Sequence, residues 1–168
     1  MKRIIVIGCP GSGKSTFSRA LQSKTGLPLY YLDMMYWNPD KTKVEKSVFL
    51  DRLASVLQKD AWIIDGNYSS TMETRLQACD TVFFLDYPLE TCLNGIRERR
   101  GKERPDLPWY ETEKEDPEFL AFIKSFEEQS RPAIIELLKK YPEKTVRVFS
   151  NRREADEYLK NVQRQIPK

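Results

Sequence analysis

The stretch Gly8-Cys9-Pro10-Gly11-Ser12-Gly13-Lys14-Ser15 decides the fold. It matches the pattern G-x-x-x-x-G-K-[ST] in full, and a chain of this length contains such a match by chance roughly once in two hundred sequences. The motif follows the apolar run Arg3–Ile7 and leads into an amphipathic segment, Lys14–Lys24. A strand, a glycine-rich turn and a helix in this order predict a phosphate-binding loop.

The backbone of this loop determines what it can bind. Glycines let successive N–H groups turn toward one anion, and the following helix adds the positive end of its dipole. Lys14 then reaches the β- and γ-phosphates of a nucleotide, and the Ser15 hydroxyl ligates Mg²⁺. Cys9 is either a thiol activated by the same positive field or, as we prefer, a small spacer. The predicted nucleotide-binding residues are Gly8, Pro10, Gly11, Ser12, Gly13, Lys14, Ser15 and Thr16.

Short apolar runs alternate with longer amphipathic segments along the chain. The runs expected as strands are Arg3–Ile7, Leu29–Leu32, Trp62–Asp65, Thr81–Asp86 and Thr145–Phe149. The segments expected as helices are Lys14–Lys24, Glu45–Lys59, Leu89–Arg100, Pro117–Lys140 with a kink at Pro132, and Arg152–Gln165. Strands that are apolar throughout are typical of a sheet covered on both faces. The alternation therefore predicts a three-layer α/β fold, a five-stranded parallel sheet with helices on both faces.

Residues 101–116 form a long irregular stretch that is rich in charge and contains Pro105 and Pro108. Long loops within compact domains are usually functional lids or disordered segments, and we expect a small lid insertion here. No repeat, low-complexity tract or linker divides the sequence, and its 168 residues suit one domain. We therefore expect residues 1–168 to form a single domain with a lid at approximately residues 101–116.

Composition excludes several classes of protein. The chain has no histidine, which rules out a Ser-His-Asp triad, a Cys-His dyad and a His-ligated metal site. Three cysteines without CxxC spacing indicate a reducing, cytoplasmic compartment. The longest uncharged apolar stretches have about five residues, whereas a membrane span needs roughly 20. The N-terminal segment lacks the long apolar core of a secretory signal and is expected to be a buried strand.

The formal net charge of +3 is confined to one window of the sequence. Residues 97–104 (RERRGKER) hold five basic and two acidic residues, and the two kinds balance over the rest of the chain. A local excess of this kind suits an anion clamp better than the broad basic face that binds duplex DNA. A solvated helix end is the alternative, because cations also stabilise the C-terminus of a helix.

Two carboxylates are expected at the carboxyl ends of strands, where an open parallel sheet binds its ligands. Asp33 follows the second strand and is placed to accept a proton from an acceptor hydroxyl or to hold the magnesium shell; a helix-capping or turn role is the alternative. Asp65 ends the third strand and is predicted to hold Mg²⁺ together with Ser15. Asp86 competes for this role, but Tyr87-Pro88 turns the chain away, and we prefer Asp65.

Phosphoryl transfer also needs cations around the moving phosphate, and guanidinium groups suit phosphate oxygens. The candidate catalytic residues are therefore Lys14, Asp33, Arg97, Arg100, Arg104 and Arg131. Arg97 and Arg100 are expected on one helix face, Arg104 in the lid, and Arg131 before Pro132 in the longest helix. We expect at least two of these arginines to reach phosphate.

The chain lacks the N-K-x-D stretch with which GTPases read guanine, and it is shorter than the usual module of a hexameric ATPase. The sequence resembles the adenylate-kinase-like P-loop kinases and, within them, the FlaR-related DNA topology modulation proteins. The resemblance extends along nearly the whole chain. It is carried by GCPGSGKS (8–15), YYLD (30–33), WIIDGNYSSTMETRL (62–76), FFLDYP (83–88), IRERRGKERPD (96–106) and SRPAIIELL (130–138).

This resemblance implies a P-loop NTPase fold, ATP and Mg²⁺ as cofactors, and a mobile lid. It also implies an acceptor pocket between Asp33, the helix of residues 45–59 and Asp65. Adenylate kinases carry D-G-F-P-R, whose arginine holds the acceptor phosphate. This chain has Asp65-Gly66-Asn67-Tyr68 instead, and its next arginine is Arg75. The departure argues against a nucleoside monophosphate as the acceptor.

The leading hypothesis is a cytoplasmic phosphotransferase that moves the γ-phosphate of ATP to a small nucleoside, nucleotide or other hydroxyl acceptor. Its expected partners are ATP and an unidentified small molecule. Nucleic acid and membrane are not expected as partners, and the protein is expected to be a monomer or homodimer. The alternative is a nucleotide-binding regulator of DNA topology or of a protein partner, with little kinase activity. A nucleotide-dependent switch with slow hydrolysis is the third hypothesis.

Overall fold

The computed structural model describes residues 1–110 and 117–162. Within these residues, five strands form one sheet in the order β2-β3-β1-β4-β5. The strands are Arg3–Gly8 (β1), Leu29–Tyr31 (β2), Trp62–Asp65 (β3), Thr81–Leu85 (β4) and Thr145–Phe149 (β5). Every pairing is parallel, and Ile5 of the central β1 lies beside Ile64 and Val82. The predicted α/β fold with a five-stranded parallel sheet is confirmed.

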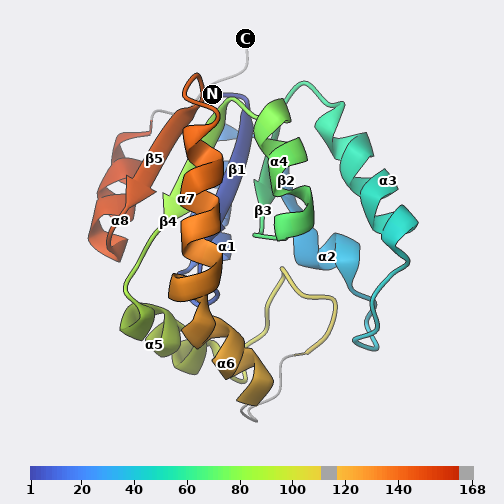
Figure 1. The fold of residues 1–168 in the computed structure, drawn as a ribbon, viewed down its shortest axis with the longest axis vertical. Helices are drawn as coiled ribbons and strands as arrows, with labels where there is room; N and C mark the ends of the chain where they lie inside the picture. The colour runs from blue at the N-terminus through green and yellow to red at the C-terminus, as the bar shows by residue number, and fades with distance from the viewer. Residues whose placement is uncertain (111–116, 163–168) are drawn as a thin grey trace.

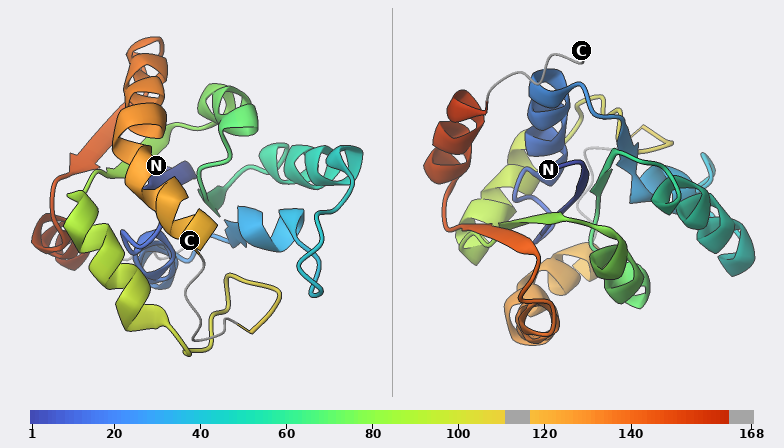
Figure 2. Two further views of the ribbon diagram at one scale, coloured as in Figure 1. Left: turned by 60° about the horizontal axis from the view of Figure 1, so that its bottom comes forward. Right: turned by 90° about the horizontal axis from the view of Figure 1, so that it is seen from above.

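Helices cover both faces of this sheet, which gives the three layers expected. The helices α1 (Lys14–Thr25) and α8 (Arg152–Asn161) lie on one face, and α4 (Ser69–Ala78) and α7 (Arg131–Lys139) lie on the other (Figure 2). Helix α3 (Lys46–Leu57) packs on the short α2 (Leu32–Tyr36), beside the β2 edge of the sheet. Among the described helices, none is long and apolar enough to cross a membrane.

The three central strands form the core of the protein. The side chains of Ile4–Ile7 in β1 are fully buried, as are Trp62–Ile64 in β3, because both faces of these strands are covered. The edge strand β5 is different, since Val148 is 51% exposed. The expectation that every strand is buried on both faces is therefore wrong for β5, although its bounds are as predicted.

The carboxyl ends of the strands meet at the lower end of the molecule in Figure 1. The helices α2, α5 (Leu89–Arg99) and α6 (Pro117–Ser125) gather there, together with the lid segment (residues 101–110, the described part of the predicted lid). An open parallel sheet binds its ligands at this end. The fold therefore brings the phosphate loop, α5 and the lid segment to one place.

The longest predicted helix, residues 117–140, is not continuous. It consists of α6, a π-helical turn over Phe126–Ser130, and α7. Pro132 explains the break, because its ring nitrogen cannot donate to the carbonyl one turn earlier and its ring clashes with that carbonyl. The amide of Arg131 instead donates to the carbonyl of Phe126, five residues before it.

Two helices were not predicted, and one prediction extends beyond the described chain. Helix α2 has five residues, too few for a periodic pattern, and α4 places a charged residue, Arg75, on its buried face. The helix predicted over residues 152–165 ends at Asn161, because Val162 is extended, and residues 163–165 lie outside the described chain.

Candidate active site at the phosphate loop

The phosphate loop joins β1 to α1 and packs directly against α5. Gly11 has a φ of +85°, which favours glycine, and a Cβ atom there would lie 2.0 Å from the carbonyl oxygen of Cys92. Gly95 is subject to the reciprocal restriction, because its own Cβ would lie 2.0 Å from the carbonyl oxygen of Gly11. The loop and the helix thus meet backbone to backbone, and this contact positions the loop relative to the helix that leads into the lid segment.

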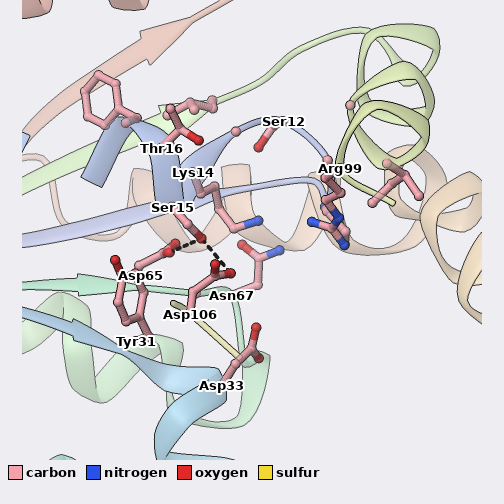
Figure 3. Close-up of a pocket in the computed structure, with 18 of the residues that line it drawn as sticks. Ser12, Lys14, Ser15, Thr16, Tyr31, Asp33, Asp65, Asn67, Arg99 and Asp106 are labelled. Atoms are coloured by element: carbon pink, nitrogen blue, oxygen red, sulfur yellow. Dashed lines mark hydrogen bonds between the residues drawn. The ribbon is translucent and has the colours of Figure 1, made fainter. Parts of the chain in front are cut away.

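Three oxygen-bearing side chains meet at the first turn of α1 (Figure 3). The Ser15 hydroxyl lies 2.5 Å from Oδ2 of Asp65, at the end of β3, and 3.1 Å from Oδ2 of Asp106, in the lid segment. Asp106 is buried and pairs with Arg104, and it lies 3.8 Å from Arg19 of α1. The structure thus brings together the two predicted metal ligands and adds a second carboxylate.

Sequence reasoning did not select Asp106. It stands in an irregular stretch, where no periodicity distinguishes a buried carboxylate from a solvated one. The available signal is local, because Asp106 follows Arg104 by two residues and Pro105 fixes the backbone between them. That signal predicts an ion pair within the lid segment but not its contact with Ser15, which lies 91 residues earlier in the sequence.

Asp65 has an environment that suits a cation. Its side chain is 5% exposed, and its second oxygen, Oδ1, has no hydrogen-bond partner among the described residues. Burial raises the pKa of this carboxyl to about 6, although the ammonium of Lys14 and the hydroxyl of Ser15 act in the opposite direction. Mg²⁺ is usually bound through one or two carboxylates, water and phosphate oxygens. The buried, unpartnered oxygen of Asp65, with Ser15 and Asp106 beside the same carboxylate, fits this chemistry.

The side chains of Asn67 and Lys14 contact the backbone at the start of the phosphate loop. The Asn67 side chain accepts a hydrogen bond from the Gly8 amide at 3.0 Å and donates one to the Gly8 carbonyl at 2.7 Å. This pair continues the β1–β3 pairing beyond Asp65. The ammonium of Lys14 lies 3.3 Å from the carbonyl oxygen of Cys9, a long contact that phosphate oxygens can replace.

The thiol of Cys9 is not activated by the loop. Cys9 is buried, lies beside Cys92 of α5, and contacts the carbonyl oxygen of Ile123 at 3.9 Å. Its hydrogen bond with Cys92, and then its burial, raise the pKa of the Cys9 thiol well above its usual value. The spacer interpretation agrees with this environment, and the alternative of an activated thiolate does not.

The phosphate loop from residue 10 onward, Asn67 and Asp106 line one pocket of about 1530 Å³ at the carboxyl end of the sheet. Asp33 and Asp65 line it as well, so the predicted phosphate, metal and acceptor residues share a single space. Gly8 is buried beneath the loop, where its backbone pairs with Asn67. The other seven predicted nucleotide-binding residues line the pocket: Pro10, Gly11, Ser12, Gly13, Lys14, Ser15 and Thr16.

The end of α5 changes which arginines face this pocket. Arg97 lies 3.5 Å from Glu90 on the exposed side of the helix and is not among the described residues that line the pocket. Helix α5 ends at Arg99, so the prediction that Arg97 and Arg100 share a helix face is wrong. Arg99 and Arg100 both line the pocket. Because a helix turns by about 100° per residue, Arg99 rather than Arg97 is the pocket-facing arginine of α5.

Arg131 and Asp86 form an ion pair with each other. Nε and Nη2 of Arg131 donate to the two oxygens of Asp86 at 2.7 and 2.8 Å, and this bidentate contact raises the pKa of Arg131. Arg131, a candidate for contact with phosphate, is therefore engaged by a carboxylate. Asp86 was the competitor of Asp65 for the metal, and the contact between Asp65 and Ser15 agrees with the preference for Asp65.

Asp33 lies on the far side of the site from the phosphate loop (Figure 3). It belongs to the first turn of α2, whose N-cap is Tyr31, so Asp33 is not a helix cap. Its Oδ1 accepts a hydrogen bond from the hydroxyl of Tyr68 at 2.6 Å. The carboxylate is therefore held in the pocket by a neighbouring side chain, as a group that contacts an acceptor would need to be.

Comparisons with known proteins agree with this architecture. No protein-family model matches the chain, and no curated protein sequence is similar to it. A shikimate kinase from Bacteroides thetaiotaomicron superposes with a TM-score of 0.60 at 19% identity, over 95% of this chain and 94% of that one. A shikimate kinase from Acinetobacter baumannii in complex with shikimate gives a TM-score of 0.62 at 18% identity, over 96% and 90%.

An unliganded sugar kinase from Janibacter sp. HTCC2649 gives a TM-score of 0.55 at 17% identity, over 95% of this chain and 91% of that one. At such identities the likeness shows the fold alone, which this chain shares with these shikimate and sugar kinases. None of the comparisons supports the narrower resemblance to DNA topology modulation proteins.

Proposed function

We propose that the protein is a magnesium-dependent kinase that transfers the γ-phosphate of ATP to a hydroxyl group of a small molecule. The observation that carries the proposal is the placement of Lys14, Ser15 and Asp65 on one side of a pocket and Asp33 on the other. The fold shared with shikimate and sugar kinases supports the same activity. We further propose that residues 1–168 act as one domain, with a lid at approximately residues 101–116.

The phosphate side of the site has a role for each residue. The loop amides and Lys14 would bind the β- and γ-phosphates, and Ser15 and Asp65 would hold Mg²⁺, which when bound neutralises phosphate charge. Arg99, Arg100 and Arg104 line the pocket and would neutralise the moving phosphoryl group. Of the four arginines predicted as catalytic, we retain Arg100 and Arg104, because Arg97 and Arg131 are not among the described residues that line the pocket.

On the acceptor side, Asp33 would orient the hydroxyl and accept its proton. The hydroxyl oxygen attacks the γ-phosphorus, the bond from that phosphorus to the β–γ bridging oxygen breaks, and ADP leaves. Because the transition state of phosphoryl transfer has little nucleophile bonding, positioning by Asp33 matters more than strong basicity.

A screen of nucleosides, sugars and small alcohols with labelled ATP tests the proposal. We expect at least one phosphorylated product, and we expect Lys14→Ala to lose phosphotransfer by about a hundredfold or more. The matched control is Lys24→Ala, in the exposed last turn of the same helix, which should behave like the wild type. Full activity in Lys14→Ala would contradict the role given to that residue. Failure of the wild-type protein to bind Mg²⁺ and ATP would contradict the proposal itself.

The second candidate is a nucleotide-binding regulator of DNA topology, suggested by the sequence resemblance and the basic window of residues 97–104. The positive charges of this window are partly neutralised, since Arg97 lies near Glu90 and Arg104 pairs with Asp106. This candidate predicts duplex binding that weakens steeply with salt. Absence of duplex binding at low salt would eliminate it.

A further inference from the structure

The acceptor side of the pocket is built from aromatic rings, which we call the aromatic wall: Tyr36, Trp37, Tyr68 and Trp109. The ring centroids of Tyr36 lie 5.0 Å from Trp37 and 4.9 Å from Tyr68, and Trp37 meets Trp109 edge-on at 5.6 Å. All four residues line the pocket. They come from α2 and its end, from the β3–α4 loop and from the lid segment, so three separate segments build one aromatic surface beside Asp33.

Asp33 presents one free oxygen to this surface. Its Oδ1 accepts the hydrogen bond from Tyr68, and Oδ2 has no hydrogen-bond partner among the residues that the structure describes. Burial, with the adjacent Asp33 charge, raises the pKa of Tyr68, which therefore remains a neutral hydrogen-bond donor. The fixed carboxylate leaves Oδ2 available to accept a hydrogen bond from a ligand hydroxyl.

Arg75, which follows Tyr68 of the aromatic wall by seven residues, is not available to bind an acidic ligand. Arg75 is fully buried, and its guanidinium donates to the backbone carbonyls of Gly66, Asn67 and Tyr68. These bonds hold the β3–α4 loop in shape. Arg75 therefore does not replace the arginine that holds the acceptor phosphate in adenylate kinases.

Other cations near the wall are also engaged or exposed. Arg104, in the lid segment with Trp109, pairs with Asp106. Arg52 donates to a backbone carbonyl of α2 at 2.8 Å. The ammonium of Lys43 lies over the rings of Tyr36 and Trp37, 6.0 and 5.8 Å from their centroids. Lys41 lines the rim of the pocket but is exposed, so water and salt screen its charge. Of the described residues of α2 and the β3–α4 loop that line the pocket, only Asp33 carries a charge, and that charge is negative.

From this arrangement we infer that the phosphoryl acceptor is an uncharged ring compound that carries a hydroxyl group, such as a nucleoside or a sugar. The ring packs against the aromatic wall, and the hydroxyl donates to Oδ2 of Asp33. An acidic group on the acceptor is repelled by Asp33 and finds no buried guanidinium on this wall among the described residues. The inference rests on the proposed function and narrows its substrate class.

The step balances without a further reagent. The acceptor oxygen forms a bond to the γ-phosphorus, the bond to the β–γ bridging oxygen breaks, and the bridging oxygen leaves with ADP. The hydroxyl proton passes to Asp33 and then to water, so each turnover yields a phosphate ester, ADP and one proton.

Matched pairs of ligands test the charge preference in the presence of Mg²⁺ and a non-hydrolysable ATP analogue, which occupies the phosphate loop so that acidic probes do not bind there. The probes are thymidine and thymidine monophosphate, adenosine and adenosine monophosphate, methyl shikimate and shikimate, and methyl glucoside and glucose 6-phosphate. Binding to the wild-type protein is followed by tryptophan fluorescence, because Trp37 and Trp109 belong to the wall, and by calorimetry. We expect at least one uncharged member to bind, and to bind about tenfold or more tightly than its acidic counterpart. Comparison of nucleosides with the glucoside distinguishes planar heterocycles from sugars.

Two outcomes would overturn the inference: acidic members that bind as tightly as their uncharged counterparts, or no saturable binding by any uncharged member. A variant ties the binding to the wall. Trp109→Leu should weaken an uncharged ring ligand by about tenfold while the affinity for Mg²⁺ and ATP stays within about twofold. If Trp109→Leu bound the uncharged ring ligand as tightly as the wild type does, the aromatic wall would not be the binding surface.

The result is distinguishable from failure of the proposed function. If the wild-type protein binds uncharged ring compounds but phosphorylates none of them, the kinase proposal fails and the ligand class stands. If it phosphorylates an acidic member in preference to its uncharged counterpart, the ligand class fails and the kinase proposal stands.

Discussion

Asp106 connects the lid segment to the phosphate loop through a single side chain. Its carboxylate contacts the Ser15 hydroxyl at 3.1 Å and pairs with Arg104, so it positions one residue that would hold Mg²⁺ and one that would face phosphate. We expect Asp106→Asn to weaken Mg²⁺-dependent ATP binding by about tenfold to a hundredfold, because groups that orient metal ligands have effects of this size. Isothermal titration with and without Mg²⁺ measures the change.

Asp60→Asn, an exposed position outside the pocket, is the matched control and should bind ATP normally. The opposite result is also informative. If Asp106→Asn bound ATP more tightly than the wild type, Asp106 would be a competitor for the phosphate position rather than a positioning residue.

Asp65 should make stability depend on pH in a direction unusual for a carboxylate. Burial raises its pKa to about 6, above the ordinary value of 3.8, so the folded protein binds a proton more tightly than the unfolded chain does. The contribution of Asp65 to the free energy of unfolding is therefore full below about pH 4 and is lost as the pH rises through about 6. In Asp65→Asn this loss does not occur.

The difference in unfolding free energy between Asp65→Asn and the wild type should grow by roughly 2 kcal/mol from pH 4 to pH 7, in favour of the variant. Urea unfolding in EDTA at several pH values measures it, since other titrating groups are common to both proteins. A difference that is constant with pH would contradict the environment described for Asp65.

The places of individual site residues could be predicted from the sequence where a motif or the end of a strand fixed them. Ser15 and Asp65 are 50 residues apart in sequence, yet the motif and the end of an apolar run sufficed to place them together. Arg97 was misplaced because a shift of two residues along a helix changes the face, and the sequence does not show which face meets the pocket. Asp106 lies in a loop, where burial depends on tertiary contacts that no local pattern records.

At the scale of secondary-structure elements, apolar runs predicted all five strands. For the three central strands, β3, β1 and β4, the reason is that both faces need apolar residues. Helices α2 and α4 escaped prediction for physical reasons. The first is too short for periodicity, and the second buries Arg75, a charged residue that its own loop carbonyls satisfy. Local pattern thus identifies elements stabilised by apolar burial and misses those stabilised by polar contacts.

The contact between α5 and the phosphate loop gives a prediction at this scale. Alanine normally stabilises a helix interior relative to glycine by about 1 kcal/mol. In Gly95→Ala the added Cβ would lie 2.0 Å from the Gly11 carbonyl oxygen, so the helix and the loop must separate. We expect a loss of stability of about 1–3 kcal/mol and weaker ATP binding, because the displaced loop no longer presents its amides together.

Chemical unfolding and ATP titration of Gly95→Ala measure the two effects. Asn94→Ala, at the adjacent exposed position of the same helix, is the control and should keep both properties close to those of the wild type. A stabilised Gly95→Ala with unchanged ATP affinity would show that α5 does not constrain the loop.

Across the whole molecule, the site draws on segments from most of the chain. The phosphate loop, the end of β3, α5 and the lid segment all line the pocket, although they span residues 8–110 of the sequence, and α8 contributes Arg152. Elements far apart in sequence are held at one end of the sheet by its parallel topology (Figure 1). A ligand that contacts all of them must lose its contacts when any large part of the fold opens.

Binding should therefore stabilise the protein as a whole. At a concentration of ATP and Mg²⁺ about a hundred times the dissociation constant, linkage adds about 2.7 kcal/mol to the free energy of unfolding. For a domain of this size we expect the Tm to rise by about 5–11 °C. Differential scanning calorimetry measures the rise, and ATP in EDTA should give a clearly smaller one because Ser15 and Asp65 then lack the metal. Lys14→Ala should shift little under the same conditions. An equal rise in that variant would mean that ATP stabilises the protein from some place other than the phosphate loop. An equal rise in EDTA would contradict the metal-binding role given to Ser15 and Asp65.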